Sequence, residues 1–212
     1  MDDNADLVFT PSVRRAQAER GTAKLAERRA AKGFANTVTP ELATFLAAQD
    51  TAFLGTATAD GAPYVQHRGG PKGFIKVFDE RTLAFADYAG NKQYITLGNL
   101  AENDRAFLFL IDFASRSRIK IWGRMRAVED DAALIEKLFD QGYRAKPERV
   151  LLFTIEAWDV NCSSHITARF TEGDIVSAVA ALRDRIAALE AENARLRTQL
   201  GTVDEGQRGV TS

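Results

Sequence analysis

The segment "RIKIWGRMRAV", Arg118 to Val128, alternates between apolar side chains and cationic or aromatic ones along most of its length. Because side chains of a β-strand switch sides at every residue, this alternation predicts a strand with one core face and one cationic face. The core face holds Ile119, Ile121, Met125 and Ala127, and the other face holds Arg118, Lys120, Trp122, Arg124 and Arg126. The cationic face is open to water, or it forms the wall of an anion site or a subunit interface.

Six further β-rich runs surround this strand. They are "TAFLGTAT" (51–58), "YVQH" (64–67), "FIKVF" (74–78), "TLAFADY" (82–88), "RAFLFLIDF" (105–113) and "VLLFTIEAW" (150–158). Turn-forming residues such as Ala59-Asp60-Gly61 separate them, and helical patterns interrupt them only at residues 91–103 and 130–143. Seven short strands with few helices predict a mainly β (α+β) fold, a closed or nearly closed antiparallel barrel, rather than a doubly wound sheet.

Two helix-start signals precede the first strand, because Thr10-Pro11 and Thr39-Pro40 each combine a capping threonine with a first-turn proline. The first signal predicts one surface helix over residues 12–34, which is rich in alanine and arginine and poor in large apolar residues. We expect residues 1–38 to form a solvated helical arm on a dimer partner, with contact to phosphates as the alternative.

Apolar residues after Thr171 follow a heptad pattern instead of a strand pattern. Val179, Ile186 and Asn193 take the a positions, and Ile175, Leu182, Leu189 and Leu196 take the d positions. This combination favours a parallel two-stranded coiled coil over residues 172–201, whereas the alternative is one helix packed on its own barrel. We expect residues 202–212 to be a disordered tail.

The composition bounds the class of protein. The chain has 212 residues with a formal charge of −1, 45% hydrophobic residues and 27% charged residues. These values suit one globular domain with appendages and argue against a nucleic-acid-binding polycation. Cys162 is the only cysteine, and no apolar run approaches the roughly 20 residues that span a bilayer. We therefore expect a cytoplasmic protein without disulfides or metal, and no membrane or nucleic-acid partner.

Two segments carry the candidate binding residues. The first, "YVQHRGGPKGFIKV" (64–77), places cations around three glycines, which let a backbone approach a ligand closely but also serve tight turns. The second, "DYAGNKQYITLGNL" (87–100), leads into a helix expected to begin at Asn91-Lys92-Gln93, where free N–H groups and Lys92 would cradle a phosphate. Neither a GxxxxGK[ST] loop nor a GxGxxG loop after a strand occurs, so the phosphate is predicted to be that of a mononucleotide.

The order of these segments resembles the pyridoxamine 5′-phosphate oxidase-like, FMN-binding split barrels. The resemblance covers roughly Leu42 to Ile166 and includes "SRSRIKIWGRMRAVED" and "IEAWDVNCSSHIT". It implies an antiparallel split β-barrel with flanking helices over residues 39–171. It also implies FMN as cofactor, held at the interface of a homodimer.

The resemblance also implies the cofactor-binding residues. Lys92 and either Arg68 or Lys76 would hold the phosphate, and Arg118 would reach the flavin of a partner. The expected set is His67, Arg68, Gly69, Lys76, Asp87, Asn91, Lys92, Gln93, Arg118 and Trp158. This chain has Gly90-Asn91-Lys92 where the oxidases have Ser-Arg-Lys, and "WDVNCSSHIT" replaces their Arg-x-His substrate motif. The second departure argues against pyridoxamine 5′-phosphate as the substrate.

We therefore expect an FMN-dependent oxidoreductase that acts on a small molecule, with NADH or NADPH as the candidate electron donor. No residue is assigned a catalytic role, because the flavin itself would carry the redox chemistry and the roles of His67 and His165 stay open. The alternative is a flavin- or heme-carrying protein without turnover, and a third possibility is a dimerisation module with an empty cleft. A deazaflavin in place of FMN also stays open.

Overall fold

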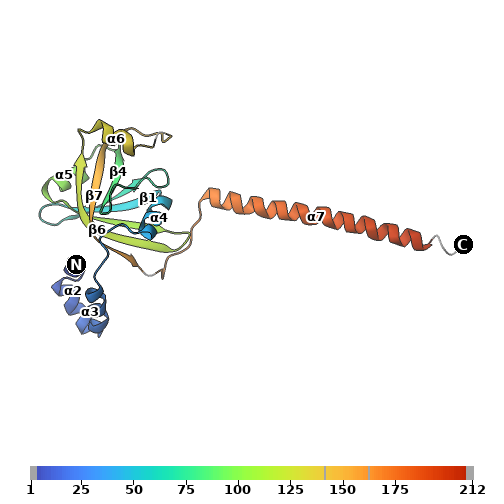
Figure 1. Cartoon of the computed structure of the whole chain (residues 1–212), viewed down its shortest axis with the longest axis horizontal. Helices are drawn as coiled ribbons and strands as arrows, with labels where there is room; N and C mark the ends of the chain where they lie inside the picture. The colour runs from blue at the N-terminus through green and yellow to red at the C-terminus, as the bar shows by residue number, and fades with distance from the viewer. Residues whose placement is uncertain (1–3, 141, 162, 209–212) are drawn as a thin grey trace. The chain divides into compact units, whose positions relative to one another are not determined.

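The computed structural model describes residues 4–140, 142–161 and 163–208. They divide into two compact units, Met1–Thr167 and Ala168–Ser212. The first unit holds the β-strands and helices α1–α6, and the second holds helix α7 (Figure 1).

The first unit is an antiparallel split β-barrel. Its strands are β1 (Thr51–Ala57), β2 (Pro63–Gly69), β3 (Lys76–Val77), β4 (Thr82–Tyr88), β5 (Arg105–Asp112), β6 (Ser117–Val128) and β7 (Pro147–Asn161). They form one sheet in the order β2-β1-β5-β6-β7-β4-β3, and Figure 1 shows the strands curving around one another. Each predicted β-rich run overlaps one of these strands, so the fold class expected from the sequence is confirmed.

The alternation along β6 places its apolar face in the core. Ile121 is fully buried and Met125 is 2% exposed, whereas Arg124 and Arg126 are exposed on the opposite face. Helix α4 (Pro40–Ala48) adds Leu42 and Leu46 to the same core. Thr39 caps this helix as predicted, because its Oγ1 accepts a hydrogen bond from the backbone N–H of Leu42 at 3.3 Å.

A β-bulge lies between Trp122 and Gly123, where the register of β6 against β7 shifts. A Cβ atom at position 123 would lie 2.1 Å from the carbonyl oxygen of Thr154 and 2.6 Å from Cε1 of Phe153. The bulge therefore requires glycine, because the backbone of β7 approaches too closely for any side chain.

The N-terminal arm forms three helices, α1 (Ala5–Val8), α2 (Pro11–Glu19) and α3 (Ala23–Lys32). The single helix predicted for residues 12–34 was wrong, because Gly21 adopts a φ of 72° and ends it. Contacts fasten the arm to β7 of its own chain. Asn4 donates to the carbonyl oxygen of Glu156 at 2.9 Å, and Arg29 pairs with Asp159 at 2.5 Å.

Helices α5 (Ile95–Glu102) and α6 (Ala132–Leu138) are shorter than predicted. Helix α5 begins later than Asn91 because Tyr94, the residue before it, lies in the left-handed region with a φ of 54°. Helix α6 begins after Asp131, whose carboxylate accepts from the backbone N–H of Leu134 at 2.9 Å.

Helix α7 (Glu172–Arg208) forms the second unit. It is longer than the predicted 172–201, so residues 202–208 of the expected disordered tail are helical, and residues 209–212 lie outside the described residues. Among the described residues, no helix is both long and apolar enough to cross a membrane.

Candidate functional site

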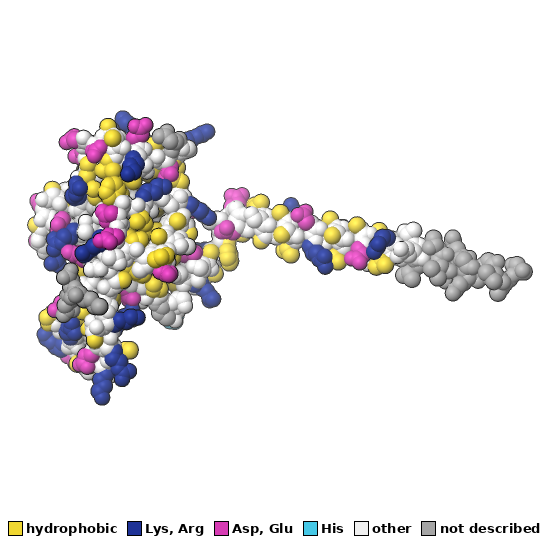
Figure 2. Space-filling view, viewed as in Figure 1, with side chains coloured by type: hydrophobic (Ala, Val, Ile, Leu, Met, Phe, Trp, Pro, Cys, Tyr) yellow, Lys and Arg dark blue, Asp and Glu magenta, His cyan; other side chains and the backbone are white. Residues whose placement is uncertain are grey.

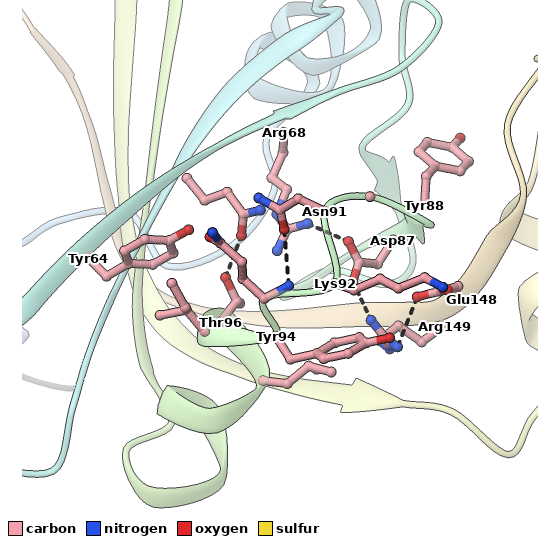
Figure 3. A pocket seen from close by; sticks show the side chains of 15 residues that line it. Tyr64, Arg68, Asp87, Tyr88, Asn91, Lys92, Tyr94, Thr96, Glu148 and Arg149 are labelled. Carbon is pink, nitrogen blue, oxygen red and sulfur yellow. Dashed lines mark hydrogen bonds and ion pairs between the residues drawn. The ribbon is translucent and has the colours of Figure 1, made fainter.

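Two cavities of the barrel meet at Arg68 and Asp87, which line both of them. The smaller, here called the Lys92 pocket, has a volume of about 60 Å³ and lies between β2, the loop 90–94 and the start of β7 (Figure 3). The larger, here called the His67 cleft, has a volume of about 570 Å³, within the range of about 300–1,000 Å³ typical of small-molecule sites. The two cavities together therefore form a site with one narrow, polar end and one wide end.

Strand β2 supplies one wall of the Lys92 pocket. Because side chains alternate along a strand, Tyr64, Gln66 and Arg68 share one face and line this pocket. Gln66 is fixed by Thr96 at the start of α5, whose hydroxyl donates to Gln66 Oε1 at 2.7 Å. His67 lies on the opposite face of β2 and is exposed, with its ring centroid 6.0 Å from that of Phe53.

A buried ion-pair network crosses the junction of the cavities. Asp87 accepts hydrogen bonds from Arg68 and from Arg149, the latter at 3.0 Å, and Figure 3 shows its carboxylate between the two guanidinium groups. Arg149 also donates to Glu129 at 2.8 Å and to Glu148 at 3.1 Å. Arg149 is therefore neutralised by three carboxylates, whereas Arg68 has only Asp87 among the described residues.

The two arginines differ in how their surroundings affect the pKa. Burial lowers the pKa of Arg68, and the attraction of Asp87 offsets this only in part. Burial also opposes the charge of Arg149, but its hydrogen bonds to Asp87 and Glu129 prevail and raise its pKa. Both guanidinium groups stay charged at neutral pH, because the ordinary pKa of arginine lies far above it.

Arg68 has a donor without a partner. Its Nε–H is buried and forms no hydrogen bond with any described residue. A buried donor left in this state costs about 1–3 kcal/mol.

The loop 90–94 forms the outer wall of the Lys92 pocket. The expected helix N-terminus at Asn91-Lys92-Gln93 was wrong, so the backbone N–H groups there belong to a turn. Asn91 Oδ1 accepts from the N–H of Gln93 at 3.2 Å, and Lys92 has a left-handed φ of 59°. Lys92 is exposed and makes no ion pair with the described residues, unlike the two arginines.

Several expected site residues lie elsewhere in this chain. Gly69 lines the His67 cleft, but Lys76, Arg118 and Trp158 line neither cavity. Lys76 pairs with Asp140 at 3.2 Å, and Trp158 donates from its indole N–H to the carbonyl oxygen of Thr37 at 2.9 Å. The Nε–H of Arg118 is buried and has no partner among the described residues.

Other candidates from the sequence contribute no catalytic grouping among the described residues. His165 lies in neither cavity and has a φ of 65°, and Cys162 lies outside the described residues. Trp122 packs against Phe107, with ring centroids 5.2 Å apart. No group of three or more histidine, cysteine or carboxylate side chains in the described part of the chain could hold a metal ion.

Sequence reasoning missed several residues of the Lys92 pocket. They are Tyr64, Gln66, Tyr94, Thr96, Glu148 and Arg149. The period of two along β2 would have placed Tyr64 and Gln66 beside Arg68. The residues around Arg149 in the sequence do not indicate that it lines the pocket, because its position there depends on the pairing of β7 with β4.

Comparison with models of protein families identifies the family to which the barrel belongs. Residues 38–162 match the family model described as pyridoxamine 5′-phosphate oxidase. The match covers more than half of the chain, and the protein therefore belongs to this family of split-barrel proteins. No curated protein matches the chain.

Solved structures of similar fold are distant in sequence. HupZ from Group A Streptococcus is 18% identical, with 62% of this chain and 99% of HupZ covered and a TM-score of 0.48. An FMN-binding protein from Syntrophomonas wolfei is 14% identical, with 71% and 95% covered and a TM-score of 0.45. An F420 reductase is 20% identical, with 57% and 98% covered and a TM-score of 0.40.

Proposed function

We propose that the barrel binds FMN and uses it for redox chemistry on a small molecule. The observation that carries the proposal is that Arg68 lines both a narrow polar pocket, which also holds Lys92 without an ion pair to any described residue, and a wide cleft. Membership of the pyridoxamine 5′-phosphate oxidase family supports a flavin as the guest. Bound FMN would supply the hydride or electron transfer itself.

The Lys92 pocket suits the phosphate. Its lining holds three cations, Arg68, Lys92 and Arg149, and two carboxylates, Asp87 and Glu148. Asp87 and Glu148 are paired with the two arginines. Lys92 therefore keeps its positive charge available for the phosphate dianion of FMN. Arg68 would add its positive charge, and the side-chain amides of Asn91 and Gln93 would add hydrogen-bond donors.

The His67 cleft suits the body of a flavin. Tyr88 and Tyr143 line it with partly exposed rings, and such aromatic side chains pack against flat rings, whereas Phe74 and Phe85 belong to the buried core beneath it. His67 at its wall has a polar N–H for the guest. The task of these residues would be to orient the ring and to exclude water from it.

The proposal includes a homodimer formed through the barrels. Arg118 and Trp158 line neither cavity of their own chain, so any contact of theirs with the flavin must come from a second copy. The substrate would differ from pyridoxamine 5′-phosphate, since the Arg-x-His motif of the oxidases is missing.

Titration of the apoprotein with FMN and with riboflavin tests the proposal, because the two ligands differ only in the phosphate. We expect flavin fluorescence to be quenched by both and FMN to bind at least tenfold more tightly. Equal affinities would overturn the phosphate assignment, and a protein that binds neither flavin would overturn the function.

The absorbance spectrum of the purified protein separates the alternatives. A flavin spectrum that NADH or NADPH bleaches and air restores would support an oxidoreductase. Flavin that stays oxidised with both donors would instead indicate a carrier without turnover, and a Soret band would indicate heme.

A further inference from the structure

Helix α7 presents an uncovered apolar stripe. Every described residue from 167 to 199 is exposed, including Val179 at 37% and Leu182 at 63%. In Figure 2 hydrophobic side chains recur along the helix between charged ones. The stripe consists of Ile175, Val179, Leu182, Ile186, Leu189 and Leu196. A long helix with such a stripe needs a partner, because tertiary packing supplies most of the stability of helices in proteins.

We propose that α7 pairs with α7 of a second copy in a parallel, in-register, two-stranded coiled coil. The spacing of the stripe by four and three residues places it at the a and d positions of a heptad repeat. Val179 and Ile186 are β-branched at a, and leucines occupy d at positions 182, 189 and 196. This distribution is the one that favours two parallel strands.

The charges beside the stripe fit a second copy of the same helix. In a parallel pair, a g residue faces the e residue five positions later on the other chain. Arg185 therefore meets Glu190 of the second copy, and Glu192 meets Arg197 of the second copy. Both pairs are attractive, and the symmetry of the dimer forms each of them twice.

Asn193 sets the direction of the two helices. It occupies an a position, so a parallel in-register pair places it opposite itself, where the two amides hydrogen-bond to each other. An antiparallel pair centred between Ile186 and Leu189 would place Asn193 against Leu182 instead. That arrangement would bury an amide without a partner, which is unfavourable.

The parallel arrangement has a consequence for the barrels. Both helices begin at Glu172, so the two barrels are joined at the same end of the coiled coil. Tethering at one end raises the concentration of each barrel near the other to roughly the mM range, whatever ligand the barrel binds. The coiled coil lies outside the residues that match the family, so this inference stands independently of the FMN proposal.

Disulfide trapping in the full-length chain tests the direction. In a Cys162→Ser background, we expect Leu182→Cys and Leu196→Cys each to form an intermolecular disulfide under mild oxidation. The matched control, Ala191→Cys at the outward f position, should form none. In an antiparallel pair, a residue lies next to its own copy only at the centre of the pairing. Positions 182 and 196 lie about 21 Å apart along the helix, so at most one of them could be at that centre. A disulfide at neither d site, or at only one of them, would overturn the parallel coiled coil.

Sedimentation tests the contribution of the stripe to the dimer. We expect Leu189→Asp to raise the dimer dissociation constant at least tenfold, as should removal of residues 171–212, because a charge enters the seam or the seam is lost. Ala191→Asp adds the same charge on the outer face and should leave the constant unchanged. Equal constants for the Leu189 variant and the parent chain would overturn the proposal.

Discussion

Asp87 and Arg149 lie directly opposite each other on the paired strands β4 and β7, and their side chains are joined by a hydrogen bond of 3.0 Å. The exposed fractions of the two side chains are only 7% and 10%. The same carboxylate holds Arg68 of β2, so three strands that are not all neighbours in the sheet are linked by one acidic residue.

Replacement of that acid by its amide isolates the contribution of its charge. Asp87→Asn should lower the free energy of unfolding by about 3 kcal/mol, because the largely buried Arg68 loses its carboxylate partner while Arg149 keeps Glu129 and Glu148. Urea denaturation measures the change. Asp140→Asn is the matched control, since its pair with Lys76 is about one-third exposed on both sides and should contribute less than about 1 kcal/mol. Similar losses for the two variants would contradict the structural role of Asp87.

Lys92→Ala tests the phosphate contact without disturbing the core, because Lys92 is exposed. The dissociation constant for FMN should rise about 10- to 100-fold, which corresponds to the loss of one charge-assisted interaction. The affinity for riboflavin should stay the same in a fluorescence titration. Lys24→Ala on α3 removes an exposed lysine far outside the lining and serves as the control. An unchanged affinity for FMN in the Lys92 variant would exclude this lysine from the site.

Two glycine substitutions should have opposite effects on stability. Gly123→Ala should lower the free energy of unfolding by about 3 kcal/mol or more, since its Cβ would overlap the backbone of β7 at the bulge. Gly98→Ala should raise it by about 1 kcal/mol, because Gly98 lies within α5 and its Cβ meets no atom within 4 Å. Thermal unfolding measures both. A tolerated alanine at position 123 would show that the bulge can relax.

The pH dependence of stability should reveal Tyr88. Burial, followed by the nearby Asp140 and Tyr143, raises the pKa of its phenol. The unfolded chain therefore loses this proton at lower pH than the folded chain does, beginning near the ordinary pKa of about 10. The contribution of Tyr88 is fully present below that pH and is lost as the pH rises through its folded pKa. Tyr88→Phe should show a shallower decline between about pH 9 and 11 in urea denaturation, and identical slopes would argue against the shift.

The sequence predicts the strands well because their information is local. Period-two alternation in β6 depends on adjacent residues only, and Ile121 and Met125 are buried as it requires. Helix boundaries were harder to predict. Nothing in the identity of Tyr94 indicates a left-handed backbone, a conformation that side chains other than glycine adopt only rarely.

The candidate site was harder still to predict from the sequence, because its residues come from segments far apart in the chain. Arg68 and Lys92 are recognisable as cations in two neighbouring motifs, but the partner that holds Arg68, Asp87, lies on another strand. Arg149 is 62 residues from Asp87 in the chain, so only the pairing of β4 with β7 brings them together. Trp158 is a predicted ring contact from its residue type alone, and nothing in the sequence indicates that its indole N–H donates to the carbonyl oxygen of Thr37.

The two left-handed residues of the loop 90–94, Lys92 and Tyr94, also bear on how tightly a guest can bind. Each such residue other than glycine costs of the order of 1 kcal/mol, and that cost is already met in the ligand-free chain. A turn that has its final shape before the guest arrives loses little conformational entropy when the guest is captured. If FMN binds without changing this backbone, the shape of the segment would contribute to affinity beside the charge of Lys92.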